Sequence, residues 1–100
     1  MPTKIHLIEQ MNNIRKLEGN VLESGSWAVT PETAEALVGG DIYFHKKQKE
    51  PSFFGGKILG YKLETEREYM GRIIFRFEYT PEHKNVPAGS GGWSNEKKIV

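Results

Sequence analysis

The chain of 100 residues has no cysteine and little continuous hydrophobicity. The lack of cysteine excludes a disulfide scaffold, thiolate metal ligands and a cysteine nucleophile. No apolar run approaches the roughly 20 residues that a membrane-spanning helix needs. The first residues also lack the apolar core of a signal peptide. We therefore expect a cytoplasmic protein that does not contact the membrane.

An excess of one charge is also missing, since 14 Lys and Arg residues stand against 13 Asp and Glu residues, for a net charge of +1. A nucleic-acid site would therefore depend on an uneven distribution of charge. Asp41 is the only aspartate, and neither a nucleophile elbow nor a Ser-His-Asp pattern is present. The three histidines have no cysteine companions and are far apart in the sequence. We expect no metal and no cofactor, and we do not favour catalysis.

The sequence does contain a series of short segments with a clear period. Thr30-Pro31-Glu32 is typical of a helix start, and Gly39-Gly40 of a helix end, which predicts a helix over 31–38. Residues 4–18 place Leu7, Ile8, Met11 and Ile14 at helical spacing, so we expect a helix there too, with a strand over 4–8 as the alternative. Alternation predicts strands over 21–29, 41–45, 57–63, 72–80 and 97–100.

Many short strands with one or two short helices predict an α+β fold. A hydrophobic fraction of 37% in 100 residues suits one domain with one core. We expect a small curled antiparallel β-barrel over residues 21–100, because closure removes exposed strand edges. A helical segment over residues 1–20 would precede it, and residues 81–92 would form a long irregular loop.

The stretch from Gly40 to Lys57 combines a strand, a basic loop, the adjacent pair Phe53-Phe54 and the adjacent pair Gly55-Gly56. Lysines supply charge for phosphate, aromatic rings stack on bases, and glycines let backbone N–H groups approach an anion. The alternative is a solvated hairpin loop with its phenylalanines in the core and a glycine turn of positive φ. The predicted contacts are Lys46, Lys47, Lys49 and Lys57 with phosphate, Phe53 and Phe54 with bases, and Gly55 and Gly56 in an anion nest.

Two tryptophans extend this hypothesis. Trp27 lies in a strand pattern and suits the core, but its ring could also stack on a base. Trp93 follows a glycine-rich stretch, and Ser94 and Asn95 next to it offer hydrogen bonds to a base edge. His45 ends a strand beside lysines, which disfavours its protonation, and it is a further candidate for contact with a ligand.

The order of elements resembles the PUA-like superfamily, especially its EVE and ASCH branches. The resemblance covers roughly residues 21–80: Trp27-Ala28-Val29, then a short helix, the Gly-Gly-Asp-Ile-Tyr-Phe-His strand at 39–45, and the glycine-rich strand at 54–61. It implies a small barrel that binds RNA or DNA and recognises a modified base in an aromatic pocket. The catalytic residue set of ASCH members has no match here, so no activity is carried over, and fold alone does not fix function.

We therefore predict a non-catalytic nucleic-acid-binding module that holds a flipped or modified base. One alternative is a protein-interaction or homodimerisation domain that uses an amphipathic helix over residues 4–18. The other is a small enzyme acting on nucleotides or modified bases through Glu78, Glu96 or Lys57.

Overall fold

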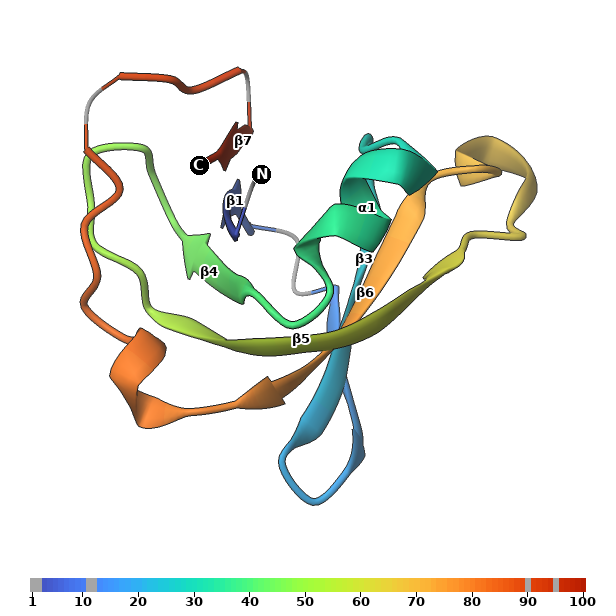
Figure 1. Cartoon of the computed structure of the whole chain (residues 1–100), viewed down its shortest axis with the longest axis horizontal. Coiled ribbons are helices and arrows are strands. Elements are labelled where there is room, and N and C mark those ends of the chain that lie inside the picture. The colour runs from blue at the N-terminus through green and yellow to red at the C-terminus, as the bar shows by residue number, and fades with distance from the viewer. Residues whose placement is uncertain (1–2, 11–12, 90, 95) are drawn as a thin grey trace.

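The computed structural model describes residues 3–10, 13–89, 91–94 and 96–100, which form one curled sheet with a short helix (Figure 1). The 7-stranded sheet has the order β2-β3-β6-β5-β4-β1-β7. The elements are β1 (Lys4–Ile8), β2 (Ile14–Glu18), β3 (Val21–Trp27), α1 (Pro31–Leu37), β4 (Asp41–His45), β5 (Phe54–Leu63), η1 (Arg67–Tyr69), β6 (Ile73–Tyr79), η2 (Pro81–His83) and β7 (Lys97–Ile99).

Local chemistry explains the helix, which the sequence predicted correctly. The Thr30 side chain accepts a hydrogen bond from the Thr33 N–H at 3.2 Å, and Pro31 occupies the first turn. Gly39 follows the helix with φ of +89°, a conformation that favours glycine. Ala34 and Leu37 are fully buried, so the helix packs its apolar stripe against the sheet.

The prediction of a helix over residues 4–18 is wrong, because this segment supplies two strands, β1 and β2. β1 pairs with β4 on one side and with β7 on the other. Ile5 and Leu7 are fully buried in the core. The burial of alternate residues and the pairing with neighbouring strands therefore determine that residues 4–8 are extended. Met11 lies outside the described residues. The described residues 4–8 and 14–18 are strands, so the interaction alternative loses the helix on which it rested.

The sheet is mostly antiparallel and is not a closed barrel. The two ends of the strand order are β2 and β7, and β1 pairs with β4 in parallel. Register shifts between Ser24 and Trp27 and between Ile58 and Gly60 interrupt the ladders on either side of β6, and such bulges increase twist. The prediction of a mostly β protein with a short helix is confirmed, whereas the barrel is corrected to an open, curled sheet.

The core lies on one face of the sheet and is rich in phenylalanine. Ile42 and Phe44 of β4 point into it together with Phe75 and Phe77 of β6. The intervening residue Tyr43 lies on the other face, where it is also buried. Thr3 lies beside Val100, since the Thr3 N–H donates to the Val100 carbonyl at 2.8 Å. In the described part of the chain, no helix is long and apolar enough to cross a membrane.

Candidate functional site

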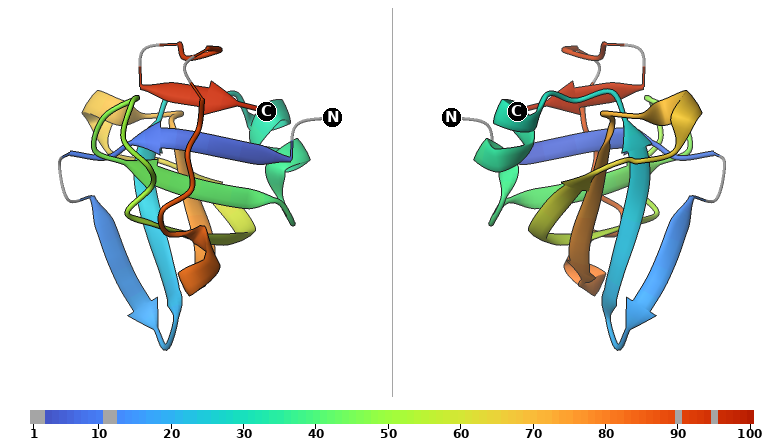
Figure 2. Two further views of the ribbon diagram at one scale, coloured as in Figure 1. Left: turned by 90° about the vertical axis from the view of Figure 1, so that its left-hand side faces the viewer. Right: turned by 90° about the vertical axis from the view of Figure 1, so that its right-hand side faces the viewer.

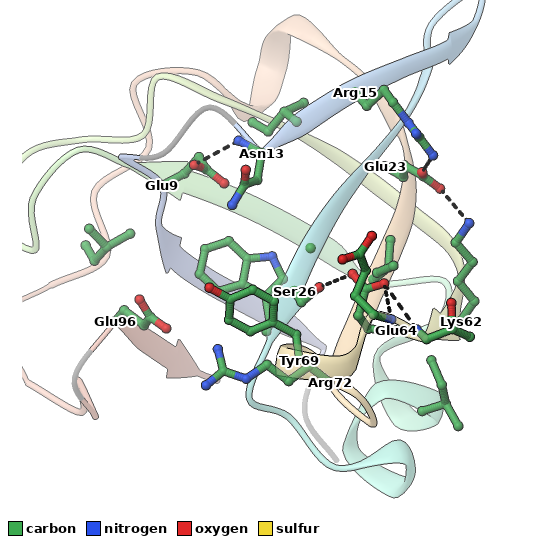
Figure 3. Close-up of a pocket in the computed structure, with 18 of the residues that line it drawn as sticks. Glu9, Asn13, Arg15, Glu23, Ser26, Lys62, Glu64, Tyr69, Arg72 and Glu96 are labelled. Carbon is green, nitrogen blue, oxygen red and sulfur yellow. Dashed lines mark hydrogen bonds and ion pairs between the residues drawn. The ribbon is translucent and has the colours of Figure 1, made fainter.

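A cavity of about 870 Å³ opens where β3 ends. One side is formed by residues that follow β1 and begin β2, and another by the connection from β5 to β6 (Figure 3). The β2–β3 hairpin beside it projects from the body of the molecule (Figure 2). The lining residues are Ile8, Glu9, Gln10, Asn13, Ile14, Arg15, Glu23, Gly25, Ser26, Trp27, Lys62, Leu63, Glu64, Thr65, Glu66, Tyr69, Arg72, Ile74 and Glu96.

Trp27 forms part of the cavity wall, and its ring is held in place. Only 6% of Trp27 is exposed, and its indole N–H donates to the Ser24 hydroxyl at 3.0 Å. The bulge before it requires Gly25, because a Cβ there would lie 2.6 Å from Ile74 Cγ1. The Gly25–Ser26 peptide bond is cis. Trp27 belongs to the hydrophobic core and also lines the cavity.

The connection between β5 and β6 is internally hydrogen-bonded and presents an aromatic ring. The Glu64 N–H donates to the Arg72 carbonyl at 2.8 Å, and the Tyr69 N–H donates to the Glu66 carbonyl at 3.1 Å. Tyr69 is 46% exposed at the cavity, and Arg72 Cζ lies 5.1 Å from the centroid of its ring. Neither Tyr69 nor Arg72 was among the residues that the sequence predicted for a site, although both line the cavity.

Carboxylates outnumber cations around the cavity, and several are already engaged. Arg15 forms an ion pair with Glu23, and Lys62 Nζ lies 3.4 Å from the other oxygen of Glu23. The Ser26 hydroxyl donates to Glu64 at 2.5 Å, and this hydrogen bond and others from backbone N–H groups hold the pKa of Glu64 below its ordinary value. The cavity is therefore suited to hydrogen-bond donors rather than to phosphate.

The basic loop after β4 is hydrogen-bonded to two residues that line the cavity, Glu9 and Gln10. The Gln10 side-chain amide donates to the Lys46 carbonyl at 2.7 Å, and Lys46 Nζ donates to the Glu9 carbonyl at 3.4 Å. Lys47 and Lys49 are exposed in this loop. The predicted lysine surface and the cavity are therefore neighbours, joined through residues that follow β1.

The remaining predicted residues of β5 do not reach the cavity. Lys57 pairs with Asp41 at 2.9 Å, and the register places this pair at the opposite end of β4 from Lys46. Gly55 and Gly56 are buried opposite Tyr43 and Ile42 in the sheet, and neither has a positive φ. The anion nest and the positive-φ turn are therefore both wrong.

The two phenylalanines are occupied within the protein. The Phe54 ring stacks on Tyr79 with 4.8 Å between centroids, and both Phe53 and Phe54 pack against the core. Lys46 Nζ lies 4.4 Å from the centroid of Phe53 and covers one face of that ring. Tyr69 also has a cation over its ring, but it is more exposed than either phenylalanine.

A pair of buried histidines occupies the face of the sheet opposite the core. His45 is fully buried, and its Nδ1 donates to the Glu50 carbonyl at 2.8 Å because a carbonyl only accepts. His45 Nε2 therefore accepts from His6 Nδ1 at 2.9 Å. Burial, His45 and the charges of Lys98 and Lys4 lower the pKa of His6 to about 4. Contact of His45 with a ligand is therefore wrong.

The third histidine lies on the same face and clamps the loop after β6. His83 donates through Nε2 to Asp41 at 2.8 Å, and its Nδ1 accepts from the Thr80 hydroxyl. Burial raises the pKa of Asp41, but hydrogen bonds from Lys57 and His83 outweigh it and hold this pKa below its ordinary value. The described part of the chain has no grouping of three His, Asp or Glu side chains that could hold a metal ion.

Trp93 and Ser94 are adjacent in the chain but have different neighbours, since Trp93 contacts His45 and Ser94 lines a small cavity. Trp93 packs edge-on against His45, with 5.7 Å between ring centroids, and anchors the loop instead of lining the cavity. Ser94 lines a small adjoining cavity of about 100 Å³ together with Trp27 and Glu96. Asn95 lies outside the described residues.

Of the three residues named for the enzyme alternative, Glu78, Glu96 and Lys57, only Glu96 lines the cavity. Glu96 lines it and is exposed. Glu78 is exposed on β6, directly opposite Lys57 in the register, and neither lines the cavity.

No family model, curated protein or solved structure matches the chain. The resemblance to PUA-like domains therefore stays a prediction, and function is argued from the cavity and its surroundings.

Proposed function

We propose that this protein is a non-catalytic nucleic-acid-binding module that accepts one unstacked base in the cavity beside Trp27. The observation that carries the proposal is the junction between cavity and lysine loop, made by Lys46 with Glu9 and Gln10. Phosphates would lie along Lys46, Lys47 and Lys49, outside the cavity, while the base enters it.

The chemistry of the cavity suits a base better than a phosphate. A volume of about 870 Å³ lies within the range of roughly 300–1,000 Å³ that is typical of small-molecule sites. The exposed ring of Tyr69 offers a stacking face. Carboxylates such as Glu96 accept hydrogen bonds from amino groups on a base edge. A flipped or modified base carrying such donors is the proposed occupant.

The test uses the intrinsic fluorescence of Trp27. The chain has two tryptophans, and only Trp27 lines the cavity. A Trp93→Phe variant therefore reports on Trp27 alone. Titration with short RNA and DNA oligonucleotides, plain and base-modified, should change this fluorescence, and the affinity should fall as salt rises. No response to any oligonucleotide at low salt would refute the proposal.

Matched variants separate the phosphate contacts from the stacking contact. The triple variant Lys46→Gln, Lys47→Gln, Lys49→Gln should reduce the salt slope by about 2, since each contact to a single strand contributes about 0.7. Tyr69→Ala should weaken binding by about 1–3 kcal/mol. Lys57→Gln is the control, because Lys57 pairs with Asp41 away from the loop. If the triple variant and the Lys57→Gln control bind with equal affinity, the assignment of phosphate contacts to Lys46, Lys47 and Lys49 is contradicted.

A further inference from the structure

The surroundings of the cavity carry unequal charge. Residues 46–50, on one side, contain three lysines and one glutamate, and all five are exposed. Residues 64–72, on another side, contain three glutamates and two arginines. Glu9 and Glu64, which mark these two sides, lie well apart in the close-up (Figure 3).

By formal charge residues 64–72, including the exposed Arg67, carry −1, and residues 46–50 carry +2. Glu66 and Glu68 are exposed, and no ion pair joins either of them to a described cation. Lys62 lies near Glu23, and Arg72 is placed over the Tyr69 ring. A phosphate chain would therefore meet attraction along residues 46–50 and repulsion along residues 64–72.

This asymmetry affects a single strand and a duplex differently. A duplex carries about one negative charge per 1.7 Å of its axis, twice the density of one strand. It is also stiff over roughly 150 base pairs, so it cannot turn its second strand away from a nearby acidic surface. A single strand is flexible and can follow the lysines alone. Charges within about 10 Å interact strongly at moderate salt.

Building on the proposed function, we infer that the ligand is single-stranded nucleic acid, and that the acidic connection of residues 64–72 excludes the second strand of a duplex. The lysine loop then determines the side from which the strand approaches, and the base turns inward toward Trp27.

The first experiment compares three labelled probes of one sequence by fluorescence anisotropy with the native protein. They are a single strand, a blunt duplex, and a duplex with a single-stranded overhang. We expect the single strand and the overhang to bind alike and the blunt duplex to bind about tenfold or more weakly at low salt. A blunt duplex that binds as tightly as the single strand would overturn the inference.

The second experiment changes the acidic side directly. The double variant Glu66→Gln, Glu68→Gln should raise affinity for the blunt duplex several-fold and change single-strand affinity little. The double variant Glu18→Gln, Glu32→Gln is the control, since both residues are exposed and neither lines the cavity. If the Glu66→Gln, Glu68→Gln variant has the same ratio of blunt-duplex affinity to single-strand affinity as the native protein, the inference is overturned. That result would leave the proposed function intact. Failure of every probe to bind would refute the proposed function itself.

Discussion

Gly56 offers a sharp test of whether the paired glycines of β5 serve the fold or a ligand. A Cβ at Gly56 would lie 2.6 Å from the Glu78 carbonyl carbon and 3.0 Å from Tyr79 Cα, and closer still to the Glu78 carbonyl oxygen. These are backbone atoms of the neighbouring strand, so Gly56→Ala would force β5 and β6 apart. We expect a loss of about 1–3 kcal/mol in the free energy of unfolding, towards the upper end because backbone must move.

The control lies on the same strand. A Cβ at Gly60 would have as its nearest atom Arg76 Nη2 at 3.6 Å, an ordinary contact. Gly60→Ala should therefore be neutral or stabilise the protein by up to about 1 kcal/mol, because alanine restricts the unfolded chain. Thermal unfolding followed by circular dichroism measures the difference, at roughly 4–8 °C for each kcal/mol. If Gly56→Ala unfolds at the same temperature as Gly60→Ala, the close packing of β5 on β6 is refuted.

Two further predictions concern stability. The pKa of His6 falls from the ordinary 6.5 to about 4 on folding, so the unfolded chain binds more protons than the folded chain between these pH values. The contribution of His6 to the free energy of unfolding is therefore full above pH 6.5 and declines by on the order of 3 kcal/mol as the pH falls to about 4. Urea unfolding should show a smaller decline for a His6→Gln variant than for the native protein. Thr30→Ala should lower the free energy of unfolding by about 0.5–2 kcal/mol, because the Thr33 N–H loses its acceptor. Thr30→Ser keeps a hydroxyl oxygen at this position and should retain most of the stability in the same urea unfolding experiment. Equal losses in the two variants would rule out the helix cap.

The parts of the fold that the sequence predicted are those set by nearby residues. The helix over residues 31–37 follows from a capping threonine and a proline that act within one turn. The strand over residues 73–79 follows from the alternation in its sequence, and Ile73, Phe75 and Phe77 are the buried positions. Residues 4–18 satisfied a helical and, in part, an extended pattern. Pairing of β1 with β4 and β7 decided between them, and no local pattern encodes partners so distant in the chain.

The candidate site was predicted only where neighbouring residues in the sequence identify its members. Exposed lysines in a hairpin loop are recognisable from composition, and Lys46 contacts Glu9, which lines the cavity. The roles of Tyr69 and Arg72 depend on where the connection folds back relative to β1 and β3, which is a tertiary property. The glutamate-rich run that precedes Tyr69 was visible in the sequence, but its position beside Trp27 was not.

The correction from barrel to open sheet has a direct consequence for function. The interior of a small closed barrel is filled by its own side chains. Here β2 stands at one end of the strand order and β1 lies near the other, and the cavity is lined by residues that follow β1 and by residues of β2 and β3. Glu9 and Trp27 therefore line one space although they belong to distant parts of the sheet. The space that we propose for a base exists because the sheet curls without closing, and the lysines after β4 lie near it because β4 pairs with β1.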